Sequence, residues 1–301
     1  MKTFTRKSAV SSNSLTFSRI GNSFTSVLLG GLVALAVGVA DAKAGTLYKG
    51  WNYAIDSAND GSGGATYEER GLAFRQSGST GYFAISGGMP LAGNANGGVL
   101  NGAIAPGDLY LNFSTHNLDT QAEFNDAKVF GIRFASTNDS LGNVGGSNTS
   151  LGLFTNLNVL NLASQNLGYT TLQAYYNSGH GRPVGSMGDL SSTADVTNYF
   201  GNAGMYPNIA SGTLVSGITS LNAVELGGMD LDFAHFAAVG PQIFGFSFDL
   251  SALPVGQFTA HFFEECINDG IALKGATVPE PGTLALLGLA LAGSISLRRR
   301  R

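Results

Sequence analysis

The chain has 301 residues, 12% of them charged, with 43 glycines and a single cysteine. Few charges together with 10% aromatic residues argue against an intrinsically disordered protein, whose composition is the opposite. One cysteine excludes an internal disulfide, so an exported form has to be stabilised by packing or by bound ions.

The first 44 residues have the three parts of a secretory signal peptide. Residues 1–26 carry four basic side chains and no acidic one, residues 27–40 are an apolar run, and Ala42 and Ala44 form an A-x-A cleavage site. A transit peptide is the rival interpretation, because the basic flank is long and rich in Ser and Thr. A retained membrane helix is disfavoured, since 14 apolar residues are fewer than the roughly 20 that span a bilayer. We therefore predict export through the Sec machinery, with cleavage by signal peptidase before Gly45.

The part of the chain that remains after processing is strongly acidic. Residues 45–278 carry 7 Lys or Arg and 18 Asp or Glu, which gives a net charge of −11. Such a surface repels nucleic acids and anionic lipids and attracts cations. Nucleic-acid binding usually requires a basic stripe, so we exclude nucleic acid as a partner.

Alternating hydrophobicity predicts β-strands throughout residues 45–278. In chain order the predicted strands are 46–55, 81–88, 107–114, 128–136, 151–160, 171–178, 243–250 and 257–266. One modest helix is predicted within 191–201, where Ser and Thr precede Ala194 to Phe200. We find neither a repeat nor a linker, and we therefore predict an all-β protein with a single β-sandwich of jelly-roll type over 45–278.

Acidic loops are the candidate metal ligands. Asp56, Asn59 and Asp60 precede a glycine-rich turn, and Asp230 and Asp232 alternate along the chain. Calcium binds six to eight oxygens of this kind. The EF-hand spacing is absent, however, and Asx turns explain the same residues through local hydrogen bonds. We expect no cofactor, with structural calcium as the alternative at these five positions.

The segment HFFEEC holds the most reactive side chains, namely His261, Glu264, Glu265 and Cys266. On a strand His261 and Glu265 share one face and Glu264 points to the other, so the segment alone offers no three-ligand metal site. A packed histidine beside a buried thiol is the favoured interpretation. The motifs G-x-S-x-G, G-x-G-x-x-G and G-x-x-x-x-G-K-[ST] are absent. We predict no catalytic residue, although four histidines leave a hydrolytic triad open.

The C-terminal tail combines two prolines, an apolar stretch and four arginines. Residues 283–297 would span roughly 22 Å as a helix, which is less than the roughly 30 Å of a hydrocarbon core. Arg298, Arg299, Arg300 and Arg301 would stay on the cytoplasmic side by the positive-inside rule. The prolines keep the preceding junction extended. We expect a weak or transient transmembrane anchor, and a permanent C-terminal anchor is the alternative.

The order Pro279-Glu280-Pro281, apolar stretch and terminal arginines resembles the PEP-CTERM sorting signal of bacterial proteins that exosortase processes. The resemblance implies that these three residues are the recognition motif, that exosortase is a partner, and that the following tail is removed. It also implies a location in the cell envelope, at the cell surface or outside the cell. The chain is accordingly divided into a signal peptide (1–44), a surface domain (45–278) and a sorting signal (279–301).

The central domain resembles exosortase-dependent surface proteins that are common in cyanobacteria and carry no assigned activity. The segments that carry this likeness are 51–64, 107–114, 129–140, 244–258 and 265–271. We expect a structural or adhesive protein that associates with extracellular polysaccharide and is not an enzyme. A carbohydrate-binding module is one alternative and requires an exposed aromatic row, for which Trp51 and the tyrosines are candidates. A secreted hydrolase is the other, and it requires two carboxylates or a Ser–His pair in a cleft.

Overall fold

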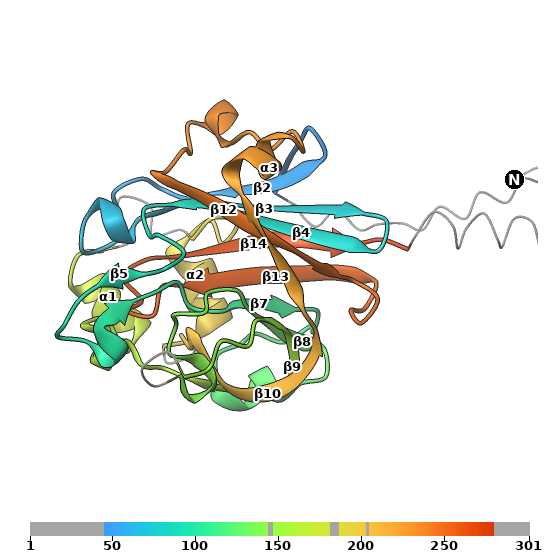
Figure 1. Ribbon diagram of the computed structural model, residues 1–301. Coiled ribbons are helices and arrows are strands. Elements are labelled where there is room, and N and C mark those ends of the chain that lie inside the picture. The colour runs from blue at the N-terminus through green and yellow to red at the C-terminus, as the bar shows by residue number, and fades with distance from the viewer. Residues whose placement is uncertain (1–44, 144–146, 181–186, 203–204, 280–301) are drawn as a thin grey trace, which may run out of the picture. The chain divides into compact units, whose positions relative to one another are not determined.

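The computed structural model describes residues 45–143, 147–180, 187–202 and 205–279. Within these ranges, the chain folds mainly into β-strands joined by short helices (Figure 1). No helix among them is both long enough and apolar enough to cross a membrane. The predicted signal peptide and the apolar part of the tail lie outside the described residues.

Two antiparallel sheets of six strands each form the body of the domain. The first sheet has the order β1 (Thr46–Tyr48), β2 (Trp51–Ile55), β3 (Glu69–Ser77), β4 (Thr80–Gly87), β12 (Gln242–Asp249) and β11 (Ile218–Asn222). The second has the order β10 (Asn208–Ser216), β9 (Gly152–Leu160), β8 (Val129–Arg133), β7 (Leu109–Asn112), β13 (Gly256–Phe263) and β14 (Gly270–Thr277). A small hairpin of β5 (Asn94–Ala95) and β6 (Ala103–Ile104) stands apart from both sheets.

Aromatic side chains fill the space between the two sheets. Phe74 of β3 packs edge-on against Phe258 of β13, with ring centroids 5.0 Å apart. Phe134, just after β8, stacks on Phe246 of β12 at 5.2 Å. Because these pairs join one sheet to the other, the predicted β-sandwich is confirmed. Its strand order is not that of a jelly roll, since β1–β4 and β7–β10 are two meanders that each stay within one sheet.

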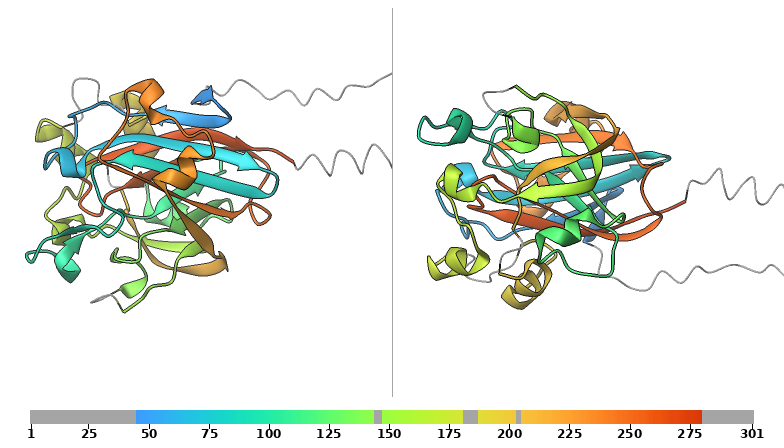
Figure 2. Two further views of the ribbon diagram at one scale, coloured as in Figure 1. Left: turned by 45° about the horizontal axis from the view of Figure 1, so that its top comes forward. Right: turned by 90° about the horizontal axis from the view of Figure 1, so that it is seen from below.

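The outer faces of both sheets are also covered. Helices α1 (Leu172–Asn177) and α2 (Thr193–Phe200) belong to an apolar cluster on the outer side of the second sheet, and α3 (Ala223–Gly227) to one on the first (Figures 1 and 2). Trp51 is consequently fully buried, and its Nε1 donates to the Met229 carbonyl at 2.8 Å. Strands with two covered faces lose the apolar–polar alternation of a half-exposed strand.

The helix at 193–200 was predicted, whereas the strand predicted at 171–178 is wrong. That segment forms α1, because the Thr171 side chain accepts the Ala174 N–H at 3.1 Å and thereby caps a helix. Leu172 and Tyr175, three residues apart, share the buried face of this helix. The predicted strand at 46–55 is a hairpin of β1 and β2, with positive φ at Lys49 and Gly50.

Candidate functional site

A loop after β2 brings two predicted ligands next to a third acidic residue. Asp56 follows the last residue of β2, Asp60 lies in the loop that comes next, and Asp269 immediately precedes β14. The loop is attached to the Asp269 segment because the Ser62 N–H donates to the Asn268 carbonyl at 2.7 Å. Asn59 has a φ of 67°, a left-handed conformation that Asn tolerates well, and this explains its place in the turn.

The carboxylates of Asp56, Asp60 and Asp269 form a compact buried triad. One oxygen from each lies within 4.8 Å of the other two, and the residues are 8%, 3% and 2% exposed. Asp56 Oδ1 accepts the Gly188 N–H at 2.8 Å, and Asp269 accepts the N–H groups of Glu69 and Gly270 at the same distance. Asp56 Oδ2 and Asp60 Oδ1 are buried without any hydrogen-bond partner.

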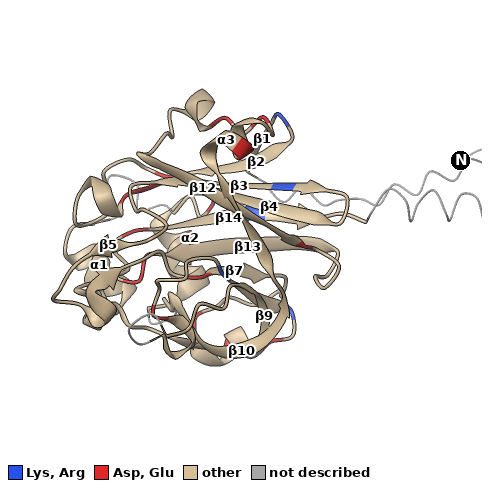
Figure 3. Ribbon diagram, in the orientation of Figure 1, with Lys and Arg blue, Asp and Glu red and all other residues tan. Residues whose placement is uncertain are grey.

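Three buried glutamates, Glu68, Glu69 and Glu264, lie close to this triad. We call these three and the triad together the acidic cluster. The described residues form two salt bridges, Lys49–Asp232 and His116–Asp126, and neither includes a member of the cluster. Lys and Arg are sparse on the domain as a whole (Figure 3). The acidic cluster therefore concentrates negative charge where water cannot solvate it, which is costly unless a cation compensates.

The burial of the acidic cluster changes the acidity of its members. Burial and the charge of Glu68 raise the pKa of Asp60 to about 7 and the pKa of Glu69 to about 8. The pKa of Asp269 lies well above its usual value, first because of burial and then because of the charges of Asp56 and Asp60. All these shifts have the direction expected of carboxylates that lack a neighbouring positive charge.

The structure therefore unites only part of the predicted calcium set. Asp56 and Asp60 lie together, whereas Asn59 is exposed and contributes its backbone N–H to Glu68. Asp230 and Asp232, the other two candidates, lie outside the acidic cluster. Asp232 forms a 3.1 Å salt bridge with Lys49 and caps a short helix through the His235 N–H.

Asp269 was missed because it is more than 200 residues away from Asp60 in the sequence. One signal was present, since Asn-Asp-Gly occurs both at 59–61 and at 268–270. The two copies meet in space: a Cβ on Gly61 would lie 3.0 Å from the Asp269 side chain, so a larger residue would have to displace that side chain. Glu68 was missed because a Glu-Glu pair followed by an arginine carries no distinguishing metal-binding pattern.

The HFFEEC segment does not form one reactive site. His261 is enclosed by aromatic rings, with the Tyr199 hydroxyl 3.4 Å from Nδ1, and burial lowers its pKa to about 3. Glu264 joins the acidic cluster, whereas Glu265 accepts the Ala105 N–H at 2.9 Å. Cys266 is buried, and burial raises the pKa of its thiol. A packed histidine and a buried thiol, as favoured from the sequence, describe these residues.

A second buried polar group surrounds Arg133, whose side chain is fully buried at the end of β8. Its guanidinium donates to Asn138 Oδ1 at 2.8 Å and to the carbonyls of Ser136, Asn138 and Ser150 at 3.0–3.2 Å. Asn138 in turn donates to Asp108 Oδ1 at 2.8 Å. This network ties the loop after β8 to the strands of the second sheet.

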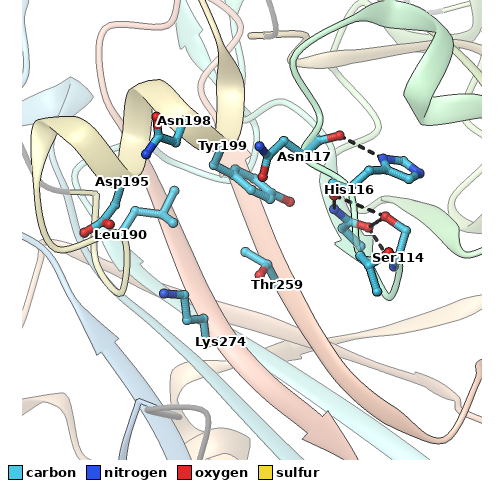
Figure 4. A pocket seen from close by; sticks show the side chains of 11 residues that line it. Ser114, His116, Asn117, Leu190, Asp195, Asn198, Tyr199, Thr259 and Lys274 are labelled. Carbon is cyan, nitrogen blue, oxygen red and sulfur yellow. Dashed lines mark hydrogen bonds between the residues drawn. The ribbon is translucent and has the colours of Figure 1, made fainter.

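A polar pocket of about 280 Å³ opens near α2. Figure 4 shows Asp195, Asn198 and Tyr199 on the helix, Ser114, His116 and Asn117 on a loop, and Thr259 and Lys274 on strands β13 and β14. The loop is held in place because the Asn112 side chain donates to the His116 carbonyl at 2.9 Å. Amide and hydroxyl groups of this kind can donate hydrogen bonds to, and accept them from, a polyhydroxylated ligand.

The described aromatic side chains do not provide a stacking row. Every Phe, Tyr and Trp in the described ranges is buried or half-buried. The large apolar side chains that are exposed there, such as Leu47 and Val224, are all Leu or Val. The sugar-stacking role considered for Trp51 and the tyrosines is therefore not supported.

The processing residues lie at the edge of the described chain or beyond it. Ala42, Ala44, Glu280, Pro281 and the four terminal arginines are outside the described residues. Pro279 is the last described residue and is exposed. Just before it, Val278 is held by two hydrogen bonds to the Gln76 side chain, at 2.8 and 2.9 Å. Val278 alone thus separates β14 from the first residue of the predicted sorting motif.

Comparison with known proteins identifies only this tail. Residues 277–301 match the family model of the PEP-CTERM protein-sorting motif. No curated protein and no solved structure is significantly similar to the chain.

Proposed function

From the premise that the chain is a PEP-CTERM protein, targeted by exosortase for export and surface sorting, we propose that its β-sandwich is a structural or adhesive module that binds extracellular polysaccharide. The tail would hold the protein at the membrane only until it is processed. The Sec machinery and signal peptidase would act at the other end. No catalytic step is assigned to the domain.

The polar pocket near α2 carries this proposal. Its described lining is dominated by amides and hydroxyls, including Asn112, Asn198 and Thr259, with only one lysine and one aspartate. A neutral, hydroxyl-rich sugar is the ligand that such a lining matches by hydrogen bonding. Sugar recognition in this pocket would not depend on an exposed aromatic row. A hydrolase is less well supported. The described lining of the pocket holds a single carboxylate, Asp195, and both ring nitrogens of His116 are bonded to Asn117 and Asp126 rather than to Ser114.

Replacement of a pocket amide is expected to weaken polysaccharide binding. N198A and N117A should each lower the affinity of the full-length protein for the extracellular polysaccharide of its host by about 3- to 10-fold, the value of one hydrogen bond. Adsorption isotherms on the isolated polysaccharide measure this. N158A is the matched control, because Asn158 is exposed on β9 and does not line the pocket. Equal binding by all three variants would contradict the pocket assignment, and release of new reducing ends would indicate a hydrolase.

The mass of the protein in its host tests the processing at both ends. We expect a chain that begins near Gly45 and ends near Pro279, with any additional mass belonging to an attached anchor. Intact-mass spectrometry of the envelope fraction and of the culture medium gives both termini. A membrane-bound chain that still ends at Arg301 would contradict transient anchoring and tail removal.

A further inference from the structure

We infer that Asp56, Asp60 and Asp269 bind one calcium ion that links the two sheets of the sandwich. This inference is independent of the proposed polysaccharide binding. Asp56 follows β2 of the first sheet, and Asp269 precedes β14 of the second. An ion held between them would connect the sheets in a chain that has no disulfide available for the purpose.

The geometry of the triad matches one shared cation. Calcium–oxygen distances are about 2.3–2.6 Å, so two oxygens on the same ion lie at most about 5 Å apart. The three carboxylates already meet this limit, with one oxygen of each within 4.8 Å of the others. All three donors are oxygens, which favours calcium or magnesium over zinc or copper.

Two unpartnered atoms point to a ligand at this place. Asp56 Oδ2 and Asp60 Oδ1 are buried and have no hydrogen-bond partner, while the other Asp56 oxygen is held by Gly188. Buried polar atoms are almost always satisfied, so two orphaned carboxylate oxygens in one buried triad require an explanation. A bound cation satisfies both of them at once.

The charge balance leads to the same conclusion. Nine of the eighteen acidic side chains within 45–278 are buried, and six of them belong to the acidic cluster. No Lys or Arg of the described residues forms a salt bridge with any of the six. Ionised carboxylates this close together repel one another strongly in a water-poor environment. One divalent ion offsets two of these charges, and protonation of the glutamates can neutralise others.

Calcium is expected to raise the thermal stability of the protein, and the effect should depend on the triad. For full-length protein in detergent, we expect 1 mM CaCl₂ to raise Tm by several degrees over 1 mM EDTA, as measured by circular dichroism. Equilibrium dialysis with calcium should give one tightly bound ion. D60N and D269N should each lower the calcium affinity at least tenfold. D230N is the control, because Asp230 is exposed and outside the cluster.

The direction in which D60N changes the stability, with and without calcium, distinguishes a metal ligand from a residue that only contributes to packing. In EDTA, D60N should be more stable than the unaltered protein, because it removes one of the repelling charges. In calcium it should be less stable, because it removes a ligand. If D230N lost as much calcium affinity as D60N, the ion would be binding non-specifically to the acidic surface, and the inference would be overturned. An equal rise of Tm in magnesium would also overturn it. A Tm unchanged by EDTA but lowered in R182Q would overturn it too, because Arg182, which lies outside the described residues, would then be the counter-charge.

Discussion

Replacement of Arg133 by methionine is expected to lower the free energy of unfolding by about 3–5 kcal/mol. The guanidinium is fully buried and donates to Asn138 Oδ1 and to three backbone carbonyls. Methionine fills a similar volume, but it removes the donor of the Ser150 carbonyl and the positive charge near buried Asp108. The Ser136 and Asn138 carbonyls would keep the Asn143 amide as their donor. Each unsatisfied group costs about 1–3 kcal/mol, and relaxation of the loop recovers part of the sum. Urea unfolding at pH 7 measures the change.

Lys128 provides the control for this substitution. It is exposed and immediately precedes β8, the strand that ends with Arg133. K128M also removes one positive charge, yet it should change the free energy of unfolding by less than about 0.5 kcal/mol. A change in R133M as small as that in K128M would contradict the expectation. That result would mean that other donors satisfy the carbonyls that Arg133 contacts, and that the network around Asp108 does not stabilise the second sheet.

Acid is expected to destabilise the protein through His261. Burial lowers the pKa of this histidine to about 3, whereas an unfolded histidine has a pKa near 6.5. Between these values the unfolded chain binds a proton that the folded chain does not, so stability falls as the pH decreases below 6.5. The expected slope from this residue is about 1.4 kcal/mol per pH unit, or roughly 3 kcal/mol between pH 6.5 and pH 4.

The variant H261F isolates this contribution. The rings of Tyr110, Phe124, Tyr199 and Phe200 surround the site, so a phenyl ring suits it chemically. Its larger size can shift the whole stability curve, but it cannot change the slope with pH. The buried carboxylates titrate in both proteins and cancel in the difference between the two curves. The free energy of unfolding of both proteins is measured in urea from pH 7 to pH 4. As the pH decreases, the stability of H261F relative to the unaltered protein should increase. Parallel curves would contradict a neutral buried histidine.

The all-β class could be predicted because aromatic alternation survives in strands such as β7, β8 and β12. The strand β14 was missed, since Ile271, Ala272 and Leu273 are consecutive and buried by the covers on both faces. Segment 171–178 was assigned to the wrong class because the six-residue helix within it is too short to show a helical rather than a strand periodicity. The Thr171 cap is the feature that favours the helix.

The candidate sites show the same limit of sequence reasoning. Asp56 and Asp60 could be found because they share one loop, whereas Asp269 reaches them only through the pairing of the sheets. The residues that line the polar pocket come from two loops, one helix and three strands, so no local sequence pattern indicates that they lie together. The spacing of candidate ligands along the sequence identifies those that share one segment. It gives no information about residues from distant segments that folding brings together.

Lys274 lines the pocket and lies on β14, the strand that leads directly to Pro279. About five residues, or roughly 17 Å of extended chain, therefore separate a ligand in the pocket from the point where the tail begins. Tension between an anchored tail and a bound ligand would pass through this short stretch, along the axis of one strand. The tether would then resist pulling through the shear strength of the β13–β14 pairing and through the two hydrogen bonds between Val278 and Gln76 of β3.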